Sequence, residues 1–351
     1  MQTIDPQYTQ SSASLAAVYL HSILPMLESR YAVDMTALLV ESGIDPAGLS
    51  DPENLIPFYR VGAFFMALLR ETGDQGLGLA IGASVQARSY HVLGYAILSS
   101  STISEAIDRL IRYESLAGKL GKTTLIPGDP VRLEWHCPFA GPWSSYVKEA
   151  AIAGWVTFGR ALVADNARPL AVYFDHAPMA DDDRYDAVFA CPVHFNAGWD
   201  GVAFAAEHLQ QPIVSADPAL KALMDQQARE RLEKFAHRIN LVNEVRAQIA
   251  HGLPNGEPSV EAVAQGLGLT ARALQNRLKS LEFHFKDLVD DVREQLAYAY
   301  LADESTSLID IAFLLGFAEQ SSFSRAFRRW RGCSPMAFRK SLQVLDGPPD
   351  S

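Results

Sequence analysis

The chain has 351 residues, which corresponds to about two domains at roughly 150 residues each. Hydrophobic residues make up 48% and charged residues 20%, so the sequence can form a folded core, and wholesale disorder is excluded. No run approaches ~18 consecutive apolar residues, and the N-terminus lacks a signal-peptide pattern, so we expect no membrane contact and a cytoplasmic protein. The three cysteines lie far apart, which argues against a disulfide framework or a structural zinc site.

The net charge of −11 is distributed unevenly along the chain. Residues 1–235 carry a net charge of −10, whereas residues 236–345 carry +1. Within residues 318–340, Glu319 is the only acidic residue, and the basic residues are Arg325, Arg328, Arg329, Arg331, Arg339 and Lys340. The attraction between a basic patch and phosphates acts within about a Debye length, so a local patch on an acidic protein is compatible with DNA binding.

The first 210 or so residues predict one α+β domain. Apolar residues at helical spacing predict a helix that opens near Pro57, another over 103–113, and a long, largely buried helix over 144–164. Apolar and β-branched runs bounded by turn residues predict strands at 123–126, 131–135, 170–174, 193–195 and 202–204.

A short helix, a glycine turn and a second helix are predicted over residues 259–281. Ser259 and Thr270 are suited to N-cap the two helices, and Gly266-Leu267-Gly268 forms the turn. The second helix has an apolar face, formed by Leu274, Leu278 and Leu281. Its opposite face is polar and basic, and consists of Arg272, Gln275, Asn276 and Lys279. This arrangement is typical of a helix-turn-helix.

The same arrangement recurs about 50 residues later. Ser307 and Asp310 have the spacing of a capping box, Gly316 suits a left-handed helix end, and Ser321 or Ser322 begins the next helix. The buried face of that helix is predicted to hold Phe323, Phe327 and Trp330. Its outer face is predicted to hold Ser324, Arg325, Arg328 and Arg329.

Residues 285–302 read as one helix between the two units. Eighteen residues at ~1.5 Å each span roughly 27 Å. A rigid spacer of that length is suited to holding two recognition helices near the ~34 Å that separates successive major-groove faces of B-DNA.

The C-terminal third resembles the AraC/XylS family of transcription regulators over roughly residues 240–340. The segments that carry the resemblance are Asp310–Phe317, Ser322–Trp330, Gly332-Cys333-Ser334-Pro335 and Phe338-Arg339. The N-terminal part resembles the arabinose-binding-type domain of the ornithine-utilisation-regulator branch, through Gly76-Leu77-Gly78-Leu79, Leu93–Ser100 and the helix that follows. It does not resemble the cupin barrel of the arabinose regulator, so sugar binding is not expected.

The resemblance implies that the second helix of each unit enters the major groove. Arg272, Gln275 and Asn276 would then read bases, with Lys279 toward phosphate, since Arg pairs with guanine and Asn or Gln with adenine. The second reader would consist of Gln320, Ser321, Ser322, Ser324 and Arg325, with Arg328 or Arg329 toward phosphate. Because its serines are short, we expect this unit to act mainly as a backbone anchor.

Three parts are therefore predicted: an effector-sensing or dimerisation domain over 13–210, a linker over 211–238, and an all-α double helix-turn-helix domain over 239–342. The predicted function is that of a DNA-binding transcription regulator, an activator more than a repressor. Its predicted partners are promoter DNA, RNA polymerase and a second copy of the chain, with a small-molecule effector. Control of the N-terminal domain by a partner protein is the alternative.

A ligand pocket in the N-terminal domain would use aromatic and basic side chains, with an arginine meeting a carboxylate ligand. The aromatic and polar candidates are Tyr90, His91, Tyr95, Tyr113, Trp135, Trp155 and Tyr173, and either Arg109 or Arg112 is the candidate for the carboxylate. No nucleophile elbow or Walker loop occurs, so no catalytic residue, cofactor or metal is expected, which also argues against an enzyme fused to a DNA anchor. His176 and His194 lie near an acidic run at 181–183, which we interpret as a solvated loop rather than a metal site.

Overall fold

The computed structural model describes residues 14–51, 54–137, 143–163, 168–281, 283–303, 305–331 and 333–346. Contacts between Cα atoms divide the chain into two compact units, with the boundary between Glu233 and Lys234. We call the described residues up to 233 the N-terminal unit and those from 234 the C-terminal unit. Gly332 of the family signature and the predicted start of the first domain at residue 13 lie outside the described residues.

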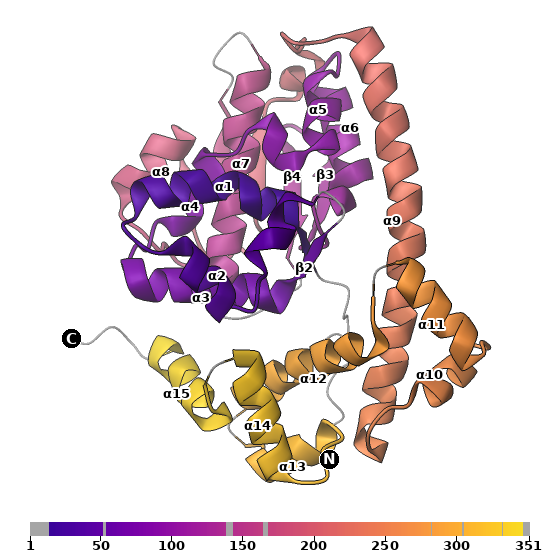
Figure 1. The fold of residues 1–351 in the computed structure, drawn as a ribbon. Coiled ribbons are helices and arrows are strands. Elements are labelled where there is room, and N and C mark those ends of the chain that lie inside the picture. Colours follow the sequence, from indigo (N-terminus) through magenta and orange to yellow (C-terminus); the bar gives the residue numbers. More distant parts are fainter. Residues whose placement is uncertain are drawn as a thin grey trace. The chain divides into compact units, whose positions relative to one another are not determined.

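The N-terminal unit combines helices with a sheet, which confirms the predicted α+β class (Figure 1). Its helices are α1 (Ala17–Arg30), α2 (Met35–Glu41), α3 (Phe58–Thr72), α4 (Leu77–Ala83), α5 (Val92–Leu98), α6 (Ile103–Tyr113), α7 (Ser144–Leu162) and α8 (Asp182–Phe189). Its strands are β1 (Ser14–Ala16), β2 (Leu55–Pro57), β3 (Lys122–Ile126), β4 (Val131–His136), β5 (Ala171–Tyr173), β6 (Val193–His194) and β7 (Gly201–Phe204). The short antiparallel pair of β1 and β2 was not predicted.

The main sheet has the strand order β3-β4-β7-β5-β6. All neighbouring strands are antiparallel except β5 and β6, which are parallel. The predicted strands at 123–126 and 131–135 are confirmed as β3 and β4, and they pair with Leu125 opposite Leu133. Along β4 the buried residues Val131, Leu133 and Trp135 alternate with more exposed ones, because successive side chains of a strand point to opposite faces. One face of the sheet therefore closes on the core.

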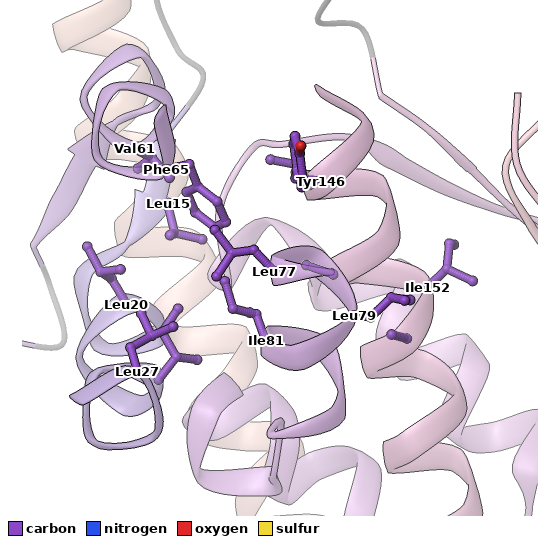
Figure 2. Packing of buried hydrophobic residues seen from close by; sticks show 14 of the residues in the cluster. Leu15, Leu20, Leu27, Val61, Phe65, Leu77, Leu79, Ile81, Tyr146 and Ile152 are labelled. Atoms are coloured by element: carbon purple, nitrogen blue, oxygen red, sulfur yellow. The ribbon is translucent and has the colours of Figure 1, made fainter. Parts of the chain in front are cut away.

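Helix α4 packs closely against α7 in the centre of this core. A Cβ atom added at Gly78 would lie 2.5 Å from the carbonyl oxygen of Tyr146, and one at Gly82 would lie 2.4 Å from the Cβ of Ala153. The two glycines, one helical turn apart, therefore allow the backbones of the helices to approach. Figure 2 shows the apolar side chains of α4, such as Leu77, among those of the neighbouring helices.

The acidic run at 181–183 does not form the predicted solvated loop. Asp181 precedes α8, and Asp182 and Asp183 lie in its first turn. Carboxylates are favourable there because the N-terminus of a helix carries a partial positive charge. In the part of the chain that the structure describes, no three His, Cys, Asp or Glu side chains are grouped so as to hold a metal ion.

The C-terminal unit is helical. Its helices are the last part of α9 (Pro218–Gly252), then α10 (Val260–Gly266), α11 (Ala271–Ser280), α12 (Phe285–Ala302), α13 (Leu308–Leu314), α14 (Gln320–Arg331) and α15 (Pro335–Asp346). They share one apolar core, to which α9 contributes Val242, Val245 and Ile249. No helix among the described residues is both long enough and apolar enough to span a bilayer.

The range predicted as a linker, 211–238, is largely helical because α9 begins at Pro218. Its first part belongs to the N-terminal unit, where Met224, Ala228 and Leu232 join an apolar cluster that also contains residues of α5, α6 and α7. The charged run after Pro218 is thus one face of a packed helix. The exact domain boundaries stay a prediction.

Glu149 of α7 is fully buried in the N-terminal unit. One of its oxygens accepts a hydrogen bond from the hydroxyl of Tyr185, and Oε2 has no partner among the described residues. Burial raises the pKa of the Glu149 carboxyl to about 8, because a buried charge loses its hydration. The folded state therefore holds a proton that the unfolded state releases at much lower pH.

Replacement of this carboxyl gives a stability prediction. The free energy of unfolding of the wild type should fall by roughly 2–4 kcal/mol between about pH 5 and pH 8, since each pKa unit corresponds to ~1.4 kcal/mol. Glu149→Gln keeps an acceptor for Tyr185 and should show a flatter profile, measured by chemical denaturation at several pH values. Glu71→Gln, at an exposed position, is the control. An unchanged slope in Glu149→Gln would contradict the assignment.

Candidate nucleic-acid interface

The first helix-turn-helix consists of α10 and α11, as predicted. The hydroxyl of Ser259 accepts a hydrogen bond from the Ala262 amide at 3.1 Å, and that of Thr270 from the Ala273 amide at 3.2 Å. Both predicted N-caps are therefore confirmed. The turn between the helices includes Gly268, whose φ of +67° is left-handed.

Helix α11 is amphipathic in the predicted sense. Leu274 and Leu278 are buried in the core of the C-terminal unit. The predicted reading residues are all exposed, and they are Arg272, Gln275, Asn276 and Lys279. Their spacing of three, four and seven residues places them on one face, because a helix has 3.6 residues per turn. The structure thus brings these four side chains together on the solvent side of α11.

The second helix-turn-helix consists of α13 and α14. The hydroxyl of Ser307 caps α13 by accepting from the Asp310 amide at 3.1 Å, and it donates to the carboxylate of Asp310 at 2.6 Å. The Asp310 side chain thus binds the capping hydroxyl, whereas a full capping box would have it bind a backbone amide. Helix α14 begins at Gln320, slightly earlier than predicted.

Gly316 closes the turn of the second unit with a φ of +72°, as its predicted left-handed role requires. A Cβ atom at this position would lie 2.6 Å from the carbonyl oxygen of Gly256 and 2.8 Å from that of Leu253. Only glycine meets both requirements, since other residues disfavour this backbone conformation and would clash. The turn is thereby packed against the segment that follows α9.

The predicted buried face of α14 is confirmed for Phe323 and Phe327, whereas Trp330 is half-buried. Phe323 and Phe327 are fully buried. Among the predicted contact residues, the exposed ones are Ser321, Arg325, Arg328 and Arg329, and the half-buried ones are Gln320, Ser322 and Ser324. The guanidinium of Arg325 donates to the Ser322 hydroxyl at 3.1 Å, and that of Arg329 to Asp290 of α12 at 2.9 Å.

The basic run over 318–340 is not a single DNA-facing patch. The side chain of Arg331 is only 7% exposed and lies over the ring of Tyr298, 4.9 Å from its centroid. Arg339 donates to the carbonyl groups of Tyr300, Leu301, Asp303 and Thr306, where α12 ends. Sequence alone does not distinguish these structural arginines from exposed ones.

Helix α12 lies between the two helix-turn-helix motifs in the chain and packs in the core of the C-terminal unit (Figure 1). The buried guanidinium of Arg293 donates to the carbonyl oxygens of Leu315 at 3.0 Å and Gly316 at 3.3 Å. It also lies over the Phe317 ring, 4.4 Å from the centroid. Asp291 of the same helix accepts from Arg246 of α9 at 3.0 Å.

The N-terminal unit contains two apolar cavities, of about 160 and 110 Å³. The first lies among α6, α7, β4 and β7, and the second among α1, α3, α6, α7 and the β3–β4 hairpin. Both are lined by Tyr90, Leu110 and Trp155. We call them the first and the second cavity.

The predicted ligand residues do not all line these cavities. Tyr90 and Trp155 line both, and Trp135 lines the second. Tyr95 is 42% exposed, whereas Tyr113 is buried; neither of them, nor Arg109, is among the lining residues. Leu110 and Glu114 were missed, since a leucine and a glutamate of an amphipathic segment carry no sequence signal for a cavity.

Arg109 binds α9 through its guanidinium. The Nε and Nη2 atoms donate to the two carboxylate oxygens of Asp225 at 2.9 and 2.7 Å. One turn away, Lys221 of α9 donates to Glu105 at 2.9 Å, and this hydrogen bond lowers the pKa of Glu105 to about 2. Two ion pairs therefore connect α6 to α9.

Comparison with known proteins identifies the class. Residues 33–213 match the family model described as the arabinose-binding domain of AraC transcription regulators, and residues 263–341 match a helix-turn-helix domain. Together with the two helix-turn-helix motifs, these matches define a helix-turn-helix transcription regulator, not an enzyme. The chain belongs to the AraC family of transcription regulators.

Three relatives illustrate the similarity. The chain is 29% identical to the ornithine utilization regulator of Pseudomonas aeruginosa, over 94% of this chain and 98% of the relative. It is 31% identical to the regulator VirS of Mycobacterium tuberculosis, over 77% of each chain. The crystal structure of the regulator CdpR from Pseudomonas aeruginosa matches with 22% identity and a TM-score of 0.42, covering 87% of this chain and 96% of that one.

The contribution of the ion pairs between α6 and α9 to stability can be tested by substitution. Arg109→Ala leaves the Asp225 carboxylate without its bidentate partner and should lower the free energy of unfolding by about 1–3 kcal/mol. It should also make α9 more susceptible to trypsin at Arg229 and Arg231. Arg112→Ala, at an exposed position of the same helix, is the control. Equal stability and equal cleavage in the two variants would refute the importance of this ion pair.

Proposed function

We propose that this AraC-family regulator reads two adjacent segments of promoter DNA with α11 and α14. The proposal rests mainly on one observation: two helices of the same core each have a polar, exposed face. The 18-residue helix α12 lies between the two helix-turn-helix motifs that contain them. At ~1.5 Å per residue α12 is roughly 27 Å long, which is close to the ~34 Å between successive major-groove faces. Both helices can then contact the same side of the duplex.

The exposed face of α11 supplies the base-specific contacts in this proposal. Arg272 can donate two hydrogen bonds to a guanine, and Gln275 or Asn276 can bind an adenine in bidentate fashion. Lys279, one turn further on, is suited to a phosphate as a flexible point charge. The absence of apolar residues from this face agrees with a groove-facing role.

Helix α14 supplies mainly backbone contacts. Ser321 and Ser322 lie in its first turn, where the partial positive charge of the helix N-terminus favours a phosphate. Arg325 is the one exposed arginine near that end, and its guanidinium already contacts Ser322. We therefore expect Arg325 to contact a base and the two serines to contact phosphates. Arg328 or Arg329 would contact a phosphate of the adjacent DNA strand.

The N-terminal unit would supply the signal. Its two cavities provide a place for a small molecule, and α6 lines both cavities and pairs with α9. Since α9 continues into the C-terminal unit, a shift of α6 has a covalent route to the DNA-binding helices. Activation through RNA polymerase and action as a homodimer remain predictions, as do the alternatives of repression and of control by a partner protein.

The reading residues are tested on DNA fragments that the protein itself selects from sheared genomic DNA. Arg272→Ala and Arg325→Ala should each weaken binding to the selected site by ~1–3 kcal/mol at matched salt, and Arg272→Ala should relax selectivity at one base pair. Arg277→Ala, on the same helix as Arg272 but outside the reading face, controls for the loss of charge. The assignment fails if the Arg272 and Arg325 variants bind the selected site as tightly as the control.

A further inference from the structure

We infer that the first cavity binds a small apolar carboxylate, whose apolar part fills the cavity and whose carboxylate binds Arg160 and Arg168. The inference deepens the proposed function and rests on it only for the consequence of binding, namely regulation. The sequence indicates Arg109 or Arg112 for the carboxylate. Neither of these lines the first cavity, and Asp225 holds the Arg109 guanidinium.

The walls of the first cavity are mainly apolar. They consist of aliphatic and aromatic side chains from α6, α7, β4 and β7, among them Ile107, Leu133 and Phe204. A cavity of roughly 150 Å³ with apolar walls is large enough to bind benzene, and this one measures about 160 Å³. An aromatic ring or a medium-length alkyl chain therefore fits, and its burial favours binding through the hydrophobic effect.

The polar side chains at these walls favour an anion. Each of them can donate a hydrogen bond, and no aspartate or glutamate is among the described residues that line the cavity. Two of them are arginines, which carry a permanent positive charge. The polar lining residues are Tyr90, Trp155, Arg160, Arg168, His208 and Gln211.

Two acceptors at the cavity walls leave this preference unchanged. The Oε1 atom of Gln211 is buried without a hydrogen-bond partner among the described residues, but rotation of the amide by half a turn exchanges it for the donors of Nε2. Glu114 lines the second cavity, which has no lysine or arginine among its described lining residues. A carboxylate is therefore expected in the first cavity and not in the second.

Arg160 is held in place by the end of α8. Its Nη1 atom donates to the carbonyl oxygen of Val188 at 2.5 Å, and its Nη2 atom donates to that of Phe189. A guanidinium has five N–H donors, so donors remain for a ligand. Because the side chain is already fixed, less conformational entropy is lost when it binds a carboxylate.

The charges of Arg160 and Arg168 lie close together without an acidic partner. Burial lowers the pKa of the Arg160 guanidinium, and the nearby charge of Arg168 lowers it further. Neither arginine forms an ion pair with another described residue. Burial raises the pKa of the neighbouring Cys191 thiol, which therefore stays neutral at pH 7, and Asp186 near that thiol is exposed. A bound carboxylate would provide the opposite charge.

The test uses the full chain without DNA and six probes: octanoate, 1-octanol, octylamine, acetate, L-ornithine and L-arabinose. Binding is followed by tryptophan fluorescence, because Trp155 lines the cavity, and by the shift in Tm. Octanoate should bind saturably and about tenfold more tightly than 1-octanol, and octylamine should bind more weakly than both. Acetate, ornithine and arabinose should give no response at the same concentrations, since they bury little apolar surface.

Three outcomes of this comparison overturn the inference. The first is 1-octanol or octylamine binding as tightly as octanoate, which would show that the arginines do not select an anion. The second is acetate binding as tightly as octanoate, which would show that the cavity does not take the apolar part. The third is no binding of octanoate.

Arg168→Gln tests the contact with the carboxylate. Arg168 is exposed, so its replacement should leave the fold intact. The variant should bind octanoate about tenfold more weakly and 1-octanol as the wild type does, because only the charged ligand loses a partner. Arg112→Gln, at an exposed position outside the cavity lining, is the control. Equal octanoate binding by the two variants would overturn the carboxylate site.

Ala106→Leu tests the cavity itself. Ala106 is buried in α6 and lines the first cavity but not the second. A leucine there takes up space in the cavity and should weaken the binding of octanoate and of 1-octanol about tenfold or more. Ala222→Leu, at an exposed position of α9, is the control. Wild-type affinity of a folded Ala106→Leu variant for both probes would refute the cavity assignment.

These results are independent of those for the DNA-reading residues. Ala106→Leu should bind the selected DNA with wild-type affinity in the absence of any probe, which shows that the chain is folded. If this core variant does not fold, Arg168→Gln alone decides, since its substitution is on the surface. Arg272→Ala and Arg325→Ala should bind octanoate as the wild type does, so failure of either proposal leaves the other standing.

Discussion

The architecture of the DNA-binding region depends on the way α12 binds the turn of the second helix-turn-helix. The guanidinium of Arg293 is buried and has lost its hydration. It donates hydrogen bonds to two carbonyl oxygens at the end of α13 and lies over the face of the Phe317 ring. Burial of a charged group is tolerated only with such compensation. Gly316, which cannot be replaced without a clash, allows the same turn to pack against the segment that follows α9. The spacing between α11 and α14 is therefore set by a single packed helix.

In the N-terminal unit, helix α6 has a connecting role like that of α12, because it contacts both the cavities and α9. One of its faces lines the two cavities, and the other carries Arg109 and Glu105, which pair with α9. A molecule that occupies the cavities would contact the first face directly. The ion pairs on the second face then couple occupancy to the helix that continues into the DNA-binding unit. The hydrophobic effect would supply the affinity for the ligand. The ion pairs would transmit the effect of ligand binding from α6 to α9.

Local patterns in the sequence predicted much of this structure. Apolar and β-branched runs bounded by turn residues predicted the strands β3 and β4, and capping residues at Ser259, Thr270 and Ser307 predicted the starts of three helices. Long-range features were not predictable: the short β1–β2 pair and the packing of α9 on α6 depend on partners far away in sequence. The same limit applies to the sites. The exposed polar face of α11 follows from helical spacing, whereas the positions of Arg331, Arg339 and Leu110 depend on tertiary contacts that have no local signature.

The most direct measurement of the central claim is the dependence of DNA affinity on the spacing between the two bound segments. Selection from random DNA should yield two conserved blocks about one helical turn apart, near 10 base pairs from centre to centre. Insertion of about five base pairs between them rotates one block to the opposite side of the duplex. If α12 fixes the two reading helices, affinity should then fall to that of DNA with a single block. Undiminished affinity after this insertion would contradict a rigid spacer and, with it, simultaneous reading by α11 and α14.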